Sequence, residues 1–190
     1  MNDVERAKWV VEALYGPEHP RLSHIERVLG ILREMQPFVP DDQAVAVVLH
    51  DTVEDGVFDL DSIEEQFGRQ VALDVENLTE KPKRCRGDFM ESVGYLRVTP
   101  RALEVRLAGR LDGWAQAQSN GNVEKERFYR QDYLMFKTVL QTVLYLPDYW
   151  VRLDALQLRR PEASWLNPAT GKREWGIGFQ VDKNGNPVVP

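Results

Sequence analysis

Apolar side chains recur at the three- and four-residue spacing of amphipathic helices along about the first 150 residues of the chain. Short breaks containing glycine, proline or asparagine separate these apolar segments. The spacing predicts helices over 4–14, 23–36, 43–53, 60–67, 69–78, 102–118, 128–146 and 150–158. Ser23 and Asp59 are expected as N-caps, and Gly68 is expected to end the fourth helix.

The third predicted helix, from Gln43 to Val53, differs from the others in its polarity. Its run AVAVVL is apolar on nearly every face rather than along one stripe. A helix that is apolar all round is typical of a protein interior. We therefore expect this helix to lie at the centre of the fold.

The pattern changes after Pro161. The segment 174–181 alternates between apolar and polar residues, and Asn184-Gly185 is a hairpin turn signal. The fold class predicted is therefore mainly α, with a helical domain over 1–160 and a C-terminal β-hairpin extension over 161–190. Such an extension is expected to mediate packing, either covering a cleft or closing a homo-oligomer.

Composition excludes several classes of protein. The chain has 190 residues, of which 43% are hydrophobic, which argues against wholesale disorder. No apolar run approaches the ~18 residues of a membrane-spanning helix, and the first residues do not resemble a signal peptide. The formal net charge of −6 argues against duplex nucleic acid as a partner, and the single cysteine, Cys85, fits a reducing compartment. We expect a cytoplasmic protein, and the net charge does not argue against a small anionic ligand.

Four titratable side chains crowd the segment that follows the apolar run. His50 and Asp51 are adjacent and can hold one divalent metal through imidazole nitrogen and carboxylate oxygen. Glu54 and Asp55 follow at i+3 and i+4 from Asp51, where they can act on the attacking water. His24, 26 residues before His50, adds a third candidate ligand. The alternative is a solvated acidic helix end beside a core histidine.

These residues resemble a known family. His24, the segment HDTVED at 50–55 and the stretches FDLDSIEEQFG and ALDVENLTEKPK that follow are similar to the HD-domain phosphohydrolases. The nearest branch is the hydrolase domain of the RelA/SpoT alarmone enzymes and their small stand-alone relatives. The likeness covers roughly residues 20–146.

The resemblance implies an all-helical fold and a Mn²⁺ ion held by His24, by His50-Asp51 and by a later Asp. It also implies that Glu54 and Asp55 serve the attacking water. The substrate class implied is a nucleotide that carries a pyrophosphate, at the 3′ position in the alarmones.

The chain departs from this family at two places. The family's later ligand lies in a helix reading roughly KLADRLHN or KLADRLDN, and here Gly109 replaces the ligand Asp and Gly113 replaces the Asn that helps to hold nucleotide. Asp112, three residues beyond Gly109 and on nearly the same helix face, is the candidate replacement metal ligand. Upstream, Tyr15-Gly16 stands where alarmone hydrolases have a basic pair.

Basic residues supply the candidates for substrate binding: Arg21, Arg110, Lys81 and Lys83. A solvated loop is the alternative for the two lysines. Tyr129, Tyr133 and Phe136 share one helix face and are expected in the core rather than as a base-stacking platform.

Two functions remain open at this point. The first is a metal-dependent phosphohydrolase acting on a nucleotide phosphate or pyrophosphate. The second is a non-catalytic HD-fold module that binds a nucleotide or a protein, which the loss of a carboxylate at Gly109 motivates. The intact HDTVED segment favours the hydrolase.

Overall fold

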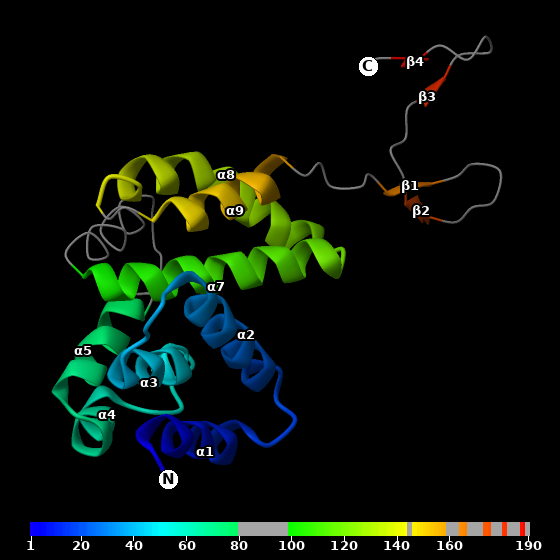
Figure 1. Cartoon of the computed structure of the whole chain (residues 1–190). Helices are drawn as coiled ribbons and strands as arrows, with labels where there is room; N and C mark the ends of the chain where they lie inside the picture. Colours follow the sequence, from blue (N-terminus) through cyan, green and yellow to red (C-terminus); the bar gives the residue numbers. More distant parts are fainter. Residues whose placement is uncertain are drawn as a thin grey trace. The chain divides into compact units, whose positions relative to one another are not determined.

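The structure is a computed structural model of the whole chain, shown in Figure 1. It describes residues 1–79, 99–143 and 146–158, together with four short strands in the last 30 residues. Two compact units are present, Met1–Leu156 and Gln157–Pro190. The described part of the first unit is helical, so the predicted mainly α fold class is confirmed.

Eight helices make up the described part of the first unit. They are α1 (Asp3–Tyr15), α2 (Pro20–Met35), α3 (Asp41–Leu49), α4 (Leu60–Phe67), α5 (Arg69–Leu78), α7 (Pro100–Ser119), α8 (Val123–Leu140) and α9 (Pro147–Leu158).

The central position of α3 follows from its composition. Every side chain from Gln43 to Leu49 is buried. Helices α1, α2 and α5 contact α3, and α4 packs on α5. The prediction of a buried central helix is confirmed.

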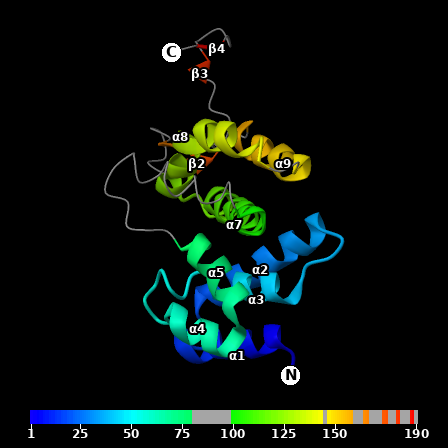
Figure 2. The same ribbon diagram turned by 90° about the vertical axis from the view of Figure 1, so that its left-hand side faces the viewer.

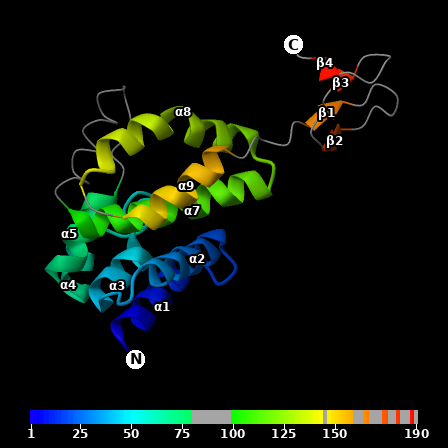
Figure 3. The ribbon, with the colours of Figure 1, turned by 45° about the horizontal axis from the view of Figure 1, so that its top comes forward.

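Helix α7 connects the two halves of the helical unit. It lies between the group formed by α2, α3 and α5 and the pair formed by α8 and α9 (Figures 1 and 2). Leu103, Leu107 and Trp114 of α7 are fully buried, and Tyr133 of α8 packs edge-on against the Trp114 ring. Figure 3 shows α7 and the pair formed by α8 and α9 from a third direction.

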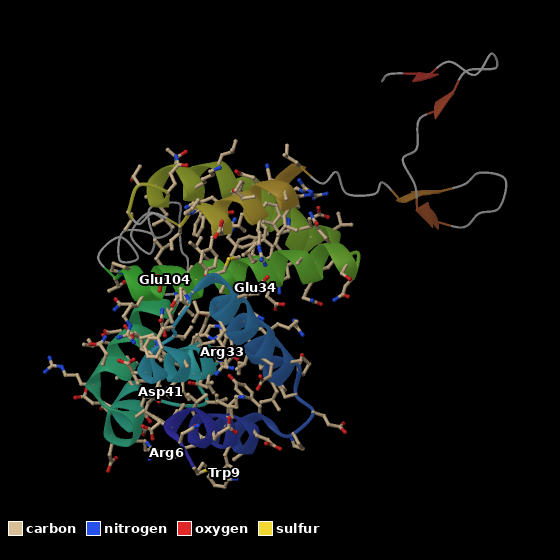
Figure 4. The ribbon with its side chains drawn as sticks, in the orientation of Figure 1. Arg6, Trp9, Arg33, Glu34, Asp41 and Glu104 are labelled. Carbon is tan, nitrogen blue, oxygen red and sulfur yellow. The ribbon has the colours of Figure 1, made fainter. Side chains whose placement is uncertain are left out.

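An ion pair also joins α2 to α9. Glu34, near the end of α2 (Figure 4), accepts hydrogen bonds from the Arg152 guanidinium of α9 at 2.6 and 3.0 Å. The pair is exposed, so its contribution to stability is small.

Local capping signals explain the bounds of α4 and α5. Asp59 accepts a hydrogen bond from the Ser62 backbone amide at 2.8 Å, which confirms it as the N-cap of α4. Gly68 has φ +90°, which favours glycine, and lies between the two helices. Both helices match their predicted ranges.

The predicted N-cap of α2 is wrong. The helix begins at Pro20, three residues before Ser23, and His19 is its N-cap. Proline at the first helical position needs no backbone donor and has a helical φ, which explains the earlier start. Ser23 lies inside the helix and donates its hydroxyl to the Pro20 carbonyl.

Helices α3 and α8 also have bounds that differ from prediction. Helix α3 ends at Leu49 rather than Val53, because the Thr52 amide and hydroxyl both bond back to the Leu49 carbonyl and tighten the chain into turns. Helix α8 begins at Val123 because Asn122 caps it, accepting from the Lys125 amide, and it ends at Leu140 rather than at 146.

The second unit contributes four short strands to the described residues. β1 (Ser164–Leu166) pairs antiparallel with β2 (Arg173–Trp175), and β3 (Gln180–Val181) pairs with β4 (Pro187–Val188). The predicted turn at Asn184-Gly185 lies outside the described residues. The β-hairpin extension and the domain boundary at 160/161 stay predictions.

None of the helices among the described residues combines the length and the apolar character that crossing a bilayer requires.

Candidate metal site and its pocket

Three candidate ligands converge where α2 meets the end of α3. His24 lies in the second turn of α2, and His50 and Asp51 directly follow α3. The two imidazole rings have centroids 5.5 Å apart. One ligand atom from each of the three residues lies within 4.8 Å of the others. The packing of α2 on α3 therefore brings together the residues that the sequence separates by 26 positions.

Hydrogen bonds orient the His50 ring. Its Nδ1 lies 2.6 Å from the Val47 carbonyl oxygen, so Nδ1 carries the proton and donates it. Nε2 lies 3.1 Å from Asp51 Oδ1 and is the nitrogen left to bind a cation. Burial lowers the pKa of His50, which keeps the imidazole neutral, as metal binding requires.

The donor set fits a divalent transition metal. Two imidazoles and one carboxylate suit Mn²⁺, Fe²⁺ or Zn²⁺ and leave positions for water and substrate. All three side chains are partly buried and keep some contact with solvent.

Asp112 projects from α7 toward His24 and is itself buried, with 3% of its side chain exposed. Its Oδ2 lies 2.6 Å from His24 Nδ1, and the Arg27 guanidinium donates to both carboxylate oxygens at 2.5 and 3.2 Å. Burial alone raises the pKa of Asp112, but the hydrogen bonds from His24 and Arg27 outweigh it and hold the pKa below its ordinary value. Asp112 therefore faces the site, with both oxygens engaged.

The two departures on α7 have different surroundings. A Cβ added at Gly109 would meet no atom within 4 Å, and Gly109 lines the pocket. A Cβ added at Gly113 would overlap the Tyr129 hydroxyl and lie 3.1 Å from its Cζ. The space is therefore open at Gly109 and filled from α8 at Gly113.

Glu54 and Asp55 lie in the turn after α3. The Asp55 amide bonds to the Asp51 carbonyl, which preserves one helical turn there. Glu54 lines the pocket beside the three candidate ligands.

Asp55 has a different environment from Glu54. Its carboxylate accepts hydrogen bonds from the Tyr15 hydroxyl at 2.7 Å and from the Arg21 guanidinium at 2.9 and 3.1 Å. Burial by itself raises the pKa of Asp55. The hydrogen bonds from Tyr15 and Arg21 lower this pKa by more, so the net shift is downward. Arg21 also donates to Asp51 Oδ2 at 2.5 Å and so connects the two carboxylates.

A pocket of about 530 Å³ surrounds the three candidate ligands. Several cations line it, which suits an anionic ligand. They are Arg21, Arg27, Arg106, Arg110 and Lys125.

Arg110 lies at the inner wall of this pocket and is largely committed to neighbours within the protein. It forms an ion pair with Asp132 and donates to the Tyr129 carbonyl at 2.8 Å. Its guanidinium lies 4.4 Å from the centroid of the Phe136 ring. The two other predicted basic residues, Lys81 and Lys83, lie outside the described residues.

Sequence reasoning missed Arg27, which lines the pocket, and Tyr15, which contacts Asp55. Neither residue belongs to a sequence motif. The contact of Arg27 with Asp112 depends on the packing of α2 against α7. The contact of Tyr15 depends on the position of Asp55. Tyr133 and Phe136 are buried, as predicted for the core, but Tyr129 is only half-buried and lines the pocket.

The chain is similar to known proteins in part of its sequence and in its fold. No protein-family model matches the chain. A protein of Mycobacterium leprae (strain TN) named "Probable GTP pyrophosphokinase" is 31% identical over 98 residues, which is 48% of this chain and 12% of that protein. The chain thus spans about an eighth of the relative's length.

A solved structure matches over most of the chain. It is described as a metazoan ortholog of SpoT that hydrolyses ppGpp and plays a role in starvation responses. The TM-score is 0.66 at 18% identity, covering 82% of this chain and 94% of the other. The chain has the fold of this SpoT ortholog. The resemblance to the hydrolase domain of the RelA/SpoT enzymes is therefore confirmed at the level of the fold.

Proposed function

We propose that the protein is a metal-dependent phosphohydrolase that removes a phosphate or pyrophosphate from a nucleotide of the alarmone class, with Mn²⁺ as its metal. The observation that carries the proposal is the convergence of His24, His50 and Asp51 beside Glu54, in a pocket lined by cations. The SpoT ortholog that shares the fold is described as hydrolysing ppGpp, which supports this substrate class.

The three ligands would hold the cation, and Glu54 would serve the water. A divalent cation bound there lowers the pKa of water and polarises a phosphoryl oxygen. Glu54 lines the pocket and is the group proposed to take the proton as the water oxygen bonds to phosphorus. The bond from phosphorus to the leaving oxygen then breaks, and that oxygen leaves with the electron pair.

Asp55 is proposed to act through Arg21. Its carboxylate holds the guanidinium through Nε and Nη2, while Nη1 of the same group reaches Asp51. This arrangement fixes a positive charge at the pocket, where a phosphate group would be neutralised. Arg110 is proposed to contribute positive charge from the pocket wall. Lys81 and Lys83, which lie between α5 and α7 in the sequence, are proposed to contribute as well.

The second candidate is a non-catalytic module that binds a nucleotide or a protein. The observation that favours it is the open space at Gly109, where the family supplies a carboxylate to the metal. Loss of an anionic ligand weakens metal binding, and a pocket without metal can still bind phosphates through its arginines.

Metal content combined with a nucleotide screen separates the two candidates. The protein purified without chelator is assayed for metal, and hydrolysis of alarmones and deoxynucleoside triphosphates is measured with and without Mn²⁺. The hydrolase predicts bound metal and Mn²⁺-dependent release of phosphate or pyrophosphate. Nucleotide binding without metal and without turnover would support the module instead.

A further inference from the structure

The contact between His24 and Asp112 suggests a role for Asp112 that differs from the one the sequence predicted. From sequence, Asp112 was the candidate fourth metal ligand. In the structure its Oδ2 contacts His24 Nδ1 at 2.6 Å, and Arg27 donates to both oxygens. A carboxylate has about four lone-pair sites, and three are used by these donors.

We infer that Asp112 is a positioning residue for His24, and that the metal site has three protein ligands rather than four. The inference rests on the proposed function, since it concerns how this chain presents His24 to a cation. Asp112 accepts the Nδ1 proton, which fixes the tautomer and turns Nε2 toward His50 and Asp51.

Each of the two histidines of the site would then be oriented by a hydrogen bond that its Nδ1 donates, but the acceptors differ. His50 donates its Nδ1 proton to a carbonyl of its own helix, that of Val47. His24 lies near the start of α2 and donates instead to a side chain of α7, 88 residues away. Arg27, one turn after His24 on α2, donates to both oxygens of Asp112 and holds the carboxylate in place.

The third histidine of the chain provides an internal reference. His19 Nδ1 accepts a hydrogen bond from the Arg21 amide at 3.3 Å, so its proton belongs on Nε2. The structure therefore assigns opposite tautomers: Nδ1–H for His24 and His50, and Nε2–H for His19.

Nitrogen-15 NMR of the histidine rings tests the inference on the full chain. Ring nitrogens are assigned with one His→Gln variant per histidine, at a pH where the rings are neutral, first without metal and then with Zn²⁺ as a diamagnetic probe. Wild-type His24 is expected as the Nδ1–H tautomer, and the Nδ1 proton is expected to persist when Zn²⁺ binds. A wild-type His24 protonated on Nε2, or loss of its Nδ1 proton on Zn²⁺ binding, would overturn the inference.

Variants of Asp112 complete the test. Asp112→Ala is expected to give a mixture of His24 tautomers and to weaken Zn²⁺ binding by about 10–100-fold, while the His50 and His19 tautomers stay unchanged. Asp112→Asn, which keeps the volume but loses the charge, is expected to fall between Asp112→Ala and the wild type. An Asp112→Ala protein with an unchanged His24 tautomer would contradict the positioning role.

Asp74→Asn is the matched control. Asp74 is also a buried carboxylate paired with an arginine, Arg101, but it lies on α5. This variant should leave the His24 tautomer and the Zn²⁺ affinity unchanged. A wild-type protein with the assigned tautomers that binds neither Zn²⁺ nor Mn²⁺ would overturn the proposed hydrolase while leaving the role of Asp112 toward His24 intact.

Discussion

Tyr129 of α8 fills the space beside Gly113 of α7, so that a Cβ at residue 113 would overlap its hydroxyl. The Tyr129 ring stacks on Trp114, with centroids 6.0 Å apart, and Arg110 lies 5.3 Å from the Tyr129 centroid. With tyrosine at residue 129 in this position, only glycine fits at residue 113 without a shift of the tyrosine. Tyr129 of α8 therefore occupies the part of the pocket wall that a side chain at residue 113 would need.

This relationship predicts that Gly113→Ala destabilises the protein. The overlap is expected to cost about 1–3 kcal/mol, which exceeds the gain of up to about 1 kcal/mol for replacing glycine inside a helix. In a Tyr129→Ala background the overlap is absent, so the same substitution should raise the free energy of unfolding. Urea denaturation of the four proteins of this double-mutant cycle measures the change in sign. Equal effects in both backgrounds would show that the two residues do not interact.

Local signals explain how much of the fold the sequence predicts. Helices α4 and α5 have their predicted bounds because Asp59 and Gly68 act within a few residues of themselves. The sequence predicts the end of α3 too late, because the residues after Leu49 keep a helical pattern of polarity. In the structure, Thr52 forms hydrogen bonds back to the Leu49 carbonyl and turns the chain. Such a turn depends on one hydroxyl and leaves no periodic signal.

The candidate site also contains some residues that are close in sequence and others that only the packing of helices brings together. His50, Asp51 and Glu54 are near neighbours in sequence, so their proximity follows from one turn of chain. The contacts of Asp112 with Arg27 and of Tyr15 with Asp55 join residues 85 and 40 positions apart. These contacts depend on how the helices pack, which hydrophobic spacing alone does not determine.

The roles assigned to Glu54 and His50 predict different losses. Glu54→Gln should abolish nucleotide hydrolysis and leave metal content near that of the wild type, because the amide cannot take a proton from water. His50→Ala should lose both metal and activity, because an imidazole ligand is removed. Metal analysis and phosphate release are measured on the same preparations. Glu65→Gln, the same change on the exposed face of α4, is the control and should match the wild type.

Equal metal loss in the Glu54→Gln and His50→Ala proteins would contradict this division of roles. Glu54 would then act as a ligand, and another group would have to accept the proton from water.

The ion pair between Asp154 of α9 and Lys137 of α8 predicts a pH-dependent stability. Asp154 accepts from Lys137 Nζ at 2.6 and 2.8 Å and from the Tyr133 hydroxyl at 2.6 Å. Burial raises the pKa of Asp154, but these donors lower it below its ordinary value overall. The carboxylate therefore binds protons less readily in the folded state than in the unfolded state.

The sign of the effect follows from linkage. The stabilisation by Asp154 is fully present above the unfolded pKa, about 3.9, and is lost as the pH falls through the lower folded pKa. Asp154→Asn should thus be less stable than the wild type at pH 7, and the difference should shrink below pH ~4. Thermal unfolding from pH 7 to pH 3 measures it, and Lys137→Met should remove much of the same pH dependence. A difference that stays constant over this range would rule out the ion pair as its source.

The open space at Gly109 gives a further prediction about stability and metal binding. Gly109→Ala should raise the free energy of unfolding by about 0.5–1 kcal/mol, because it removes a helix glycine and meets no neighbour. Gly109→Asp has the same room for its Cβ and also supplies a carboxylate to the pocket that contains His24 and His50. It should therefore tighten Mn²⁺ binding, measured by calorimetry, by tenfold or more.

Gly109→Asn separates charge from shape in this experiment. Its side chain has nearly the same volume as Asp but no charge, so it should bring little of the gain in metal affinity. A three-ligand site with Asp112 behind His24 has coordination positions to spare, and a fourth carboxylate should fill one of them. If Gly109→Asp binds Mn²⁺ no more tightly than Gly109→Asn, residue 109 does not reach the cation, and α7 contributes to the site only through Asp112 and its hold on His24.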